Sequence, residues 1–215
     1  MRPMIWRQLV AASRAPALVV GGCVNAALLS GFVIVWGYTI PLLQVVSAYD
    51  QVRFAETVIL SVVLPWVAAR VITSGRGDSF VVSCALAAIA PSTAIASSVI
   101  ALSIVLALVA VTGLPALVVA QQVFAIPFST TVRDLIGFGA LAVLAAATTV
   151  ACTMLVSGRL ASWLCAWAAT AAFLAPLRAN FTSVSWIGTI VGVGIAVCTA
   201  LWCEGSLWHM ADRHD

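Results

Sequence analysis

The sequence predicts an all-α polytopic membrane protein, and its composition and apolar runs carry that prediction. Hydrophobic residues make up 63% of the 215 residues and charged residues only 8%, whereas a soluble domain carries about a quarter charged residues. Apolar runs of roughly 18 or more residues recur along the chain, each long enough to cross a hydrocarbon core of about 30 Å as a helix. The alternation of polar and apolar residues that a membrane β-barrel needs is absent. We therefore expect one transmembrane domain over residues 1–215.

The first element expected is an amphipathic helix over residues 2–14 at the membrane surface. Arg2, Arg7 and Arg14 alternate there with apolar side chains such as Trp6. A helix of this kind lies in the interface, with its basic groups toward an anionic leaflet. A cleaved signal peptide is the alternative reading. The apolar run that follows is too long for a signal sequence and lacks a clear small-residue cleavage site.

Six membrane spans are expected after this surface helix. Their approximate limits are 15–38, 57–72, 92–111, 134–156, 160–177 and 186–203. Pro65 is expected to kink the second span. Residues 39–56 are expected to form a loop with at most a short surface helix, and residues 112–133 a surface or partly re-entrant hairpin.

The arginines predict the orientation of the chain. All ten basic residues are arginine, and cytoplasmic loops carry the excess of positive charge in membrane proteins. With the N-terminus in the cytoplasm, only Arg53, Arg133 and Arg178 fall on the outer side, and the other seven fall inside. The expected location is therefore the cytoplasmic (inner) membrane, as a multi-pass protein with both termini in the cytoplasm.

Several functional classes are disfavoured by the residues that the chain lacks. It has no lysine and no Gly-x-x-x-x-Gly-Lys loop, so it does not bind and hydrolyse ATP by that route. Its six cysteines are scattered without a Cys-x-x-Cys pair, which is typical of packing residues rather than a metal site. Its two histidines, His209 and His214, lie in the last seven residues, which disfavours haem ligation between facing helices. We predict no enzyme activity, no cofactor or metal site in this chain, and no nucleic-acid partner.

Polar groups inside the expected spans are few. Arg53, Glu56, Arg133 and Asp134 all fall at the ends of spans or outside them, so no charged side chain is expected in mid-membrane. That distribution disfavours an ion-coupled carrier, which needs buried charges. Asn25 is the one amide deep in a span. It either lines a translocation path or hydrogen-bonds a neighbouring helix, and the second role is favoured.

The last expected span carries a small-residue face, Gly188-x-x-x-Gly192. Such a face allows two helices to approach closely. Packing within the chain is favoured over a dimer contact at this face.

A polar turn, Arg76-Gly77-Asp78-Ser79, separates the second span from a mildly apolar stretch that ends at Pro91-Ser92. The residues alone leave two roles open for this turn, a docking surface or simple positive-inside charge. With the surface helix before it and six spans around it, this layout resembles the membrane-spanning subunit of ABC-2-type exporters, the type V or G-like permease fold.

The resemblance implies a function for the segment 73–90 as a cytoplasmic coupling helix that docks on a separate ABC ATP-binding subunit. The residues that it assigns to this contact are Arg76, Asp78, Ser79, Ser83, Leu86 and Ile89. It also implies a dimer of two permease subunits, identical or related, with the translocation path between them. ATP and Mg²⁺ would then bind to the partner subunit.

A different function class remains open from the sequence. The chain can also be a non-transporting structural subunit of a larger membrane complex. The scarcity of polar groups in its spans fits that role. It fits an exporter of lipids or other hydrophobic compounds equally well.

Overall fold

The computed structural model of this protein describes residues 5–6, 9–10, 13–39, 45–74, 91–125, 127–155 and 159–174. Within those ranges the chain is helical and contains no strand, which confirms the all-α class. The helices are α2 (Pro16–Thr39), α3 (Val45–Ser74), α5 (Pro91–Val111), α6 (Leu114–Val123), α7 (Phe128–Leu155) and α8 (Arg159–Leu174).

Three of these helices are long and apolar enough to cross a membrane by themselves. Their membrane-spanning stretches are Pro16–Val35, Tyr49–Ile72 and Phe128–Thr153. Helices α5 and α6 satisfy the same criteria only as a pair, bent by 41° at a short break, so the described part of the chain holds three spans, or four if this pair is one. Helix α8 has 16 residues, fewer than the roughly 20 that a membrane-crossing helix needs.

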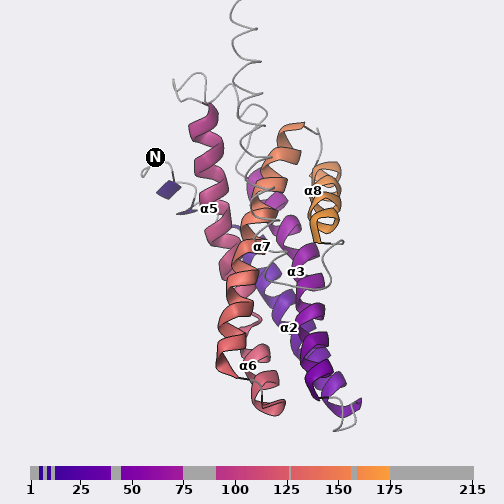
Figure 1. Ribbon diagram of the computed structural model, residues 1–215. Coiled ribbons are helices and arrows are strands. Elements are labelled where there is room, and N and C mark those ends of the chain that lie inside the picture. Colours follow the sequence, from indigo (N-terminus) through magenta and orange to yellow (C-terminus); the bar gives the residue numbers. More distant parts are fainter. Residues whose placement is uncertain are drawn as a thin grey trace, which may run out of the picture.

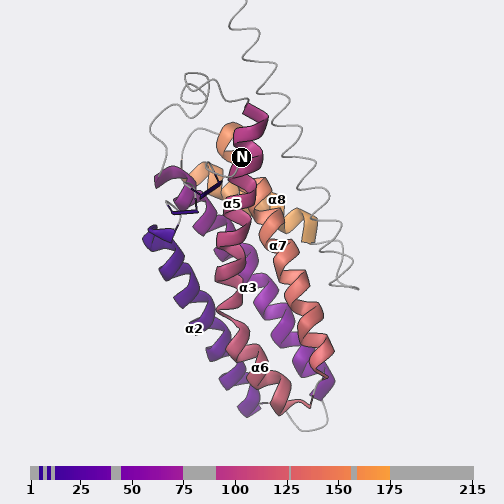
Figure 2. The ribbon, with the colours of Figure 1, turned by 90° about the vertical axis from the view of Figure 1, so that its left-hand side faces the viewer.

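The helices form an elongated bundle in which α2, α3, α5 and α7 alternate in direction, and α6 continues the course of α5 after the 41° bend (Figures 1 and 2). Helix α7 is the central element and packs against α3, α5 and α8. Helix α2 packs mainly against α3. The N-terminal ends of α2 and α5 and the C-terminal ends of α3 and α7 lie together at the upper end of the bundle, and α6 lies at the lower end.

Small side chains on α7 allow its close packing. Ala142, Ala145 and Ala146 are fully buried, and small residues at helix contacts are the usual way for membrane helices to approach one another. The larger side chains Phe138 and Leu141 from the same helix fill the core beside them. In the apolar window that qualifies α7 as a span, 78% of the residues are buried, compared with 22% in the corresponding window of α2.

The predicted limits of the first and third spans agree with α2 and α5 to within one residue. The predicted start of the second span is wrong. Residues 45–56 continue α3 toward its N-terminus instead of forming a loop, and Arg53 in this part pairs with Asp50 and with Asp134 of α7. Helix α3 also continues through Pro65, as membrane helices can when neighbouring groups compensate for the lost hydrogen bond.

The predicted hairpin over residues 112–133 is also replaced by helix. Helix α6 follows α5 after the bend, and α7 begins at Phe128, six residues before the predicted start of its span. Pro115 explains the break, since it lies in the first turn of α6 and proline favours that position. The early start of α7 places Asp134 inside a helix.

Several predicted elements lie outside the described residues. The proposed coupling contacts are among them: Arg76, Asp78, Ser79, Ser83, Leu86 and Ile89. The sixth span with Gly188 and Gly192 also lies outside. Of the predicted surface helix 2–14, residues 5–6 and 9–10 are helical, and Trp6 is exposed.

Candidate functional site

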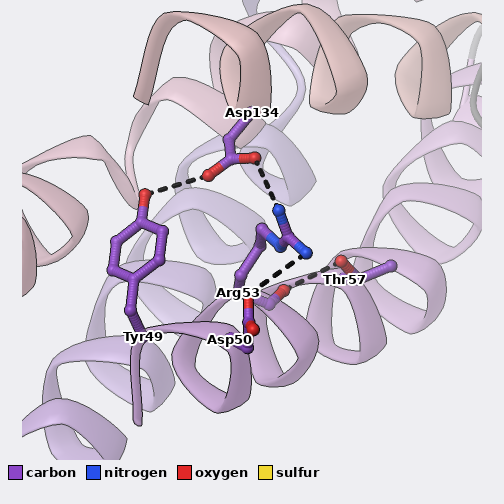
Figure 3. A network of polar contacts seen from close by, with 5 residues as sticks. All are labelled: Tyr49, Asp50, Arg53, Thr57 and Asp134. Carbon is purple, nitrogen blue, oxygen red and sulfur yellow. Dashed lines mark hydrogen bonds and ion pairs between the residues drawn. The ribbon is translucent and has the colours of Figure 1, made fainter. Parts of the chain in front are cut away.

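A network of polar side chains joins α3 to α7 in the lower half of the bundle (Figure 3). The Tyr49 hydroxyl donates a hydrogen bond of 2.9 Å to Asp134 Oδ2. Arg53 Nη1 lies 3.4 Å from Asp134 Oδ1 and forms an ion pair with it. Since the Asp134 side chain is only 1% exposed, these two donors compensate for the water that its carboxylate loses on burial.

The same arginine extends this network toward the surface. Arg53 Nη2 lies 3.3 Å from Asp50 Oδ1, one helical turn earlier on α3. The side chains of Arg53 and Asp50 are 27% and 60% exposed, respectively. On the other side of Arg53, Thr57 Oγ1 donates to its backbone carbonyl oxygen at 2.9 Å. We call Tyr49, Asp50, Arg53 and Asp134 the α3–α7 network.

Glu56 follows Arg53 by three residues and therefore lies one turn further along the same face of α3. It is 0% exposed. Neither of its carboxyl oxygens has a hydrogen-bond partner among the described residues. Its Oε1 lies against Gly113, in the break between α5 and α6, so closely that a methyl group on Gly113 would overlap it.

Asn25 approaches the same break from α2. It is 0% exposed, and its Nδ2 donates to the Val109 carbonyl oxygen and to Thr112 Oγ1, both at 3.3 Å. Thr112 Oγ1 in turn contacts the carbonyl oxygen of Gly22 on α2 at 3.1 Å. The Oδ1 of Asn25 has no partner in the described part of the chain. We call Asn25, Glu56, Thr112 and Gly113 the Glu56 site.

A further hydrogen bond fixes α6 against the beginning of α7. Thr131 Oγ1 donates to Gln121 Oε1 at 2.7 Å, and both side chains are buried. The connection between the two helices includes Ala125 with φ of 51°, a backbone conformation that side chains other than glycine adopt infrequently. The break between α5 and α6 is therefore held to α2 by Asn25 and Thr112, and the C-terminal end of α6 is held to α7 by Gln121.

Two polar contacts join α7 to α8 at the upper end of the bundle. The hydroxyl oxygens of Thr148 and Thr170 lie 3.2 Å apart. The sulfur atoms of Cys152 and Cys165 lie 3.0 Å apart, and both cysteines are free thiols. These contacts are consistent with the predicted packing role of the cysteines.

The structure tests one site prediction directly. Asn25 forms the interhelical hydrogen bond that its residue type favours. Its role in lining a path stays a prediction. Glu56 and Asp134, which were expected at the ends of spans, are buried within the candidate spanning stretches of α3 and α7.

A signal for these buried acids was present in the sequence. Asp50, Arg53 and Glu56 recur at intervals of three residues, which places them on one face of a helix rather than scattering them in a loop. The partner Asp134 was harder to find, because 81 positions separate it from Arg53.

The arrangement holds α2 to the α5–α6 break and α3 to α7. No cluster of three or more His, Cys, Asp or Glu side chains suited to a metal occurs among the described residues. Comparison of the chain with family models, curated proteins and solved structures finds no significant match.

Proposed function

We propose that this chain is the membrane-spanning permease subunit of an ATP-driven ABC exporter, which forms its translocation path as a dimer and rests on a separate ATP-binding subunit. The observation that carries the proposal is the path of the chain at the upper end of the bundle. Helix α3 ends there at Ser74 and α5 begins there at Pro91. The two described helix ends that flank residues 75–90 therefore lie at the same end of the bundle, which is compatible with a docking element there.

The charges at that end support the proposal. Arg14 at the start of α2 and Arg70 near the end of α3 are both exposed there. The Arg70 guanidinium lies 5.9 Å from the centre of the Trp66 ring, a distance typical of a cation–π contact. Arginines gather on the cytoplasmic side of membrane proteins, so we assign this end to the cytoplasm, where an ATP-binding subunit is found.

The outer surface of the bundle supports a membrane location and leaves room for a second subunit. Large apolar side chains of α2 are exposed, including Val20, Val24 and Leu28. Exposed apolar surface of this extent is unfavourable in water and is covered by lipid or by another subunit. The dimer in this proposal pairs the chain with an identical or a related permease.

A pull-down of the tagged full-length protein in mild detergent, followed by an ATPase assay of the eluate, tests the proposal. We expect recovery of a P-loop ATPase with Mg²⁺-dependent activity. The double substitution Arg76→Ala with Asp78→Ala should abolish its recovery, because it removes the charged part of the proposed contact. Arg159→Ala, which removes another arginine at the first residue of α8, is the matched control and should retain the ATPase.

Two results would count against the permease. Recovery of a large membrane complex without an ATPase would favour the non-transporting structural subunit instead. Recovery of the ATPase in equal amounts with both variants would place its contact elsewhere and remove the coupling role from Arg76 and Asp78.

A further inference from the structure

The Glu56 site contains more acceptor oxygens than donors. Both Glu56 carboxyl oxygens and Asn25 Oδ1 lack a partner in the described part of the chain, while the Asn25 amide hydrogens are directed to Val109 and Thr112. Both side chains are 0% exposed. A buried carboxylate without a counter-charge or a hydrogen-bond donor is strongly unfavourable, so something must supply a donor or a positive charge here.

The charged groups around Glu56 come from two helices. On α3 they are Asp50 and Arg53, and on α7 they are Arg133 and Asp134. Tyr49 is the other titratable side chain at this level of α3. Arg53 forms its ion pairs with Asp50 and Asp134, and Asp134 acts electrostatically on Glu56.

The remaining walls of the site carry no charge. The described side chains of α2, α5 and α6 include no acidic, basic or histidine residue, and Cys23 on α2 is exposed. Like charges repel strongly at low dielectric constant. A negative charge on Glu56 would therefore meet the Asp134 carboxylate without a compensating cation of its own.

A proton fits this site better than a metal ion does. Calcium takes about six to eight oxygen ligands and magnesium about six in a near-octahedral set. The site offers three unpartnered oxygens from two side chains. One proton on Glu56 removes its charge and creates one O–H donor, and Asn25 Oδ1 is the unpartnered acceptor on the facing helix.

We propose that Glu56 is a proton-binding site of the membrane domain, whose exchangeable proton neutralises the carboxylate at the contact of α2, α3 and the α5–α6 break. Asp50, Arg53 and Glu56 follow one face of α3 at intervals of one turn, and their exposure falls inward from 60% for Asp50 and 27% for Arg53 to 0% for Glu56. Glu56 therefore lies within two helical turns of the exposed Asp50.

The experiment uses the purified full-length protein in lipid nanodiscs. A hydrophobic carbodiimide, which reacts with protonated carboxyl groups in apolar surroundings, is applied from mildly acidic to mildly alkaline pH. Modified residues are then located by peptide mass spectrometry. We expect Glu56 to be modified at acidic pH and the modification to be lost at alkaline pH. The infrared spectrum should show a protonated carboxyl band that is absent from Glu56→Gln.

Asp50→Asn is the matched control. The Asp50 side chain is 60% exposed, so its replacement should leave the protonated carboxyl band in place. If Glu56 is recovered unmodified in the mapped peptides at every pH, or if the band survives in Glu56→Gln, the proposal is overturned. The carbodiimide result uses the unaltered chain, so it remains decisive even if Glu56→Gln does not fold.

Discussion

Arg53 Nη1 and Asp134 Oδ1 lie 3.4 Å apart and bring together two helices whose sequences are 81 positions apart. Asp134 accepts from Arg53 through one carboxyl oxygen and from Tyr49 through the other. Because both donors come from α3 and the acceptor from α7, the pair fixes the rotation and height of α3 relative to α7. The same pair separates the buried Glu56 from the exposed Asp50.

Replacement of Arg53 by glutamine should destabilise the bundle. The substitution removes the positive charge beside a 1% exposed carboxylate, and leaving a buried acceptor less satisfied costs about 1–3 kcal/mol. The free energy of unfolding, measured by denaturant titration in detergent micelles, should fall by about that amount.

Asp50→Asn is the control for this substitution. It removes the other ion pair of Arg53, in which Asp50 is 60% exposed, and exposed pairs contribute about 0–1 kcal/mol. Equal losses from Arg53→Gln and Asp50→Asn would mean that burial of Asp134 does not determine the effect.

Tyr49→Phe should cause a smaller loss of stability. It removes the 2.9 Å hydrogen bond to Asp134 and keeps the ring. Hydrogen bonds between membrane helices contribute about 0.6 kcal/mol on average and up to about 1.7 kcal/mol, so a loss in that range is expected. A double-mutant cycle with Asp134→Asn measures it, and a coupling energy of zero would contradict the contact.

Gly113→Ala should destabilise the chain, whereas Gly139→Ala should not. The backbone of Gly113 has φ of −79°, which alanine adopts freely, so only space distinguishes the two residues there. The added methyl group would overlap Glu56 Oε1 and lie 3.1 Å from Asn25 Nδ2. Overpacking of this kind costs about 1–3 kcal/mol.

Gly139 in α7 provides the comparison for this crowding effect. A Cβ atom at Gly139 meets nothing within 4 Å. Alanine in a helix interior is favoured over glycine by up to about 1 kcal/mol, so this variant should be neutral or more stable. Thermal unfolding of both variants in the same detergent checks the prediction. If Gly113→Ala were as stable as Gly139→Ala, the close contact at the break would be disproved.

Mild oxidation should cross-link α7 to α8. The sulfur atoms of Cys152 and Cys165 lie 3.0 Å apart, and closing to the length of about 2.0 Å of a disulfide bond needs only a small side-chain movement. Peptide mass spectrometry under non-reducing conditions detects the product. Cys23 on α2 is the comparison, because it is exposed and no other described cysteine contacts it. A cross-link from Cys23 to either of the others within one chain would contradict the helix arrangement.

The sequence predicted the helices whose limits depend on proline and apolar length. The first and third spans were predicted to within one residue of α2 and α5, since each begins at or beside a proline and is apolar to its end. The starts of α3 and α7 could not be found in this way. Charged residues were treated as limits of a span because isolated charges are costly in a membrane, and that cost disappears once a partner is present.

The sequence identified one residue of the candidate site, Asn25, and missed two others, Glu56 and Asp134. Asn25 stood out because it is a single amide in an apolar run. Glu56 and Asp134 did not, because their burial depends on which helices are neighbours. Hydropathy along the chain reports how a segment interacts with lipid and says little about contacts between distant segments.

The unequal burial of the helices determines where this sequence can change over evolutionary time. Helix α7 is in contact with neighbours on most of its surface, and its spanning stretch is 78% buried. A change of side-chain volume there disturbs several contacts at once. The outer positions of α2, such as Val19 and Leu28, are exposed, and any apolar residue can occupy them. Related chains should therefore keep the pattern of small residues on α7 nearly unchanged while the outer face of α2 drifts freely among valine, leucine, isoleucine and alanine.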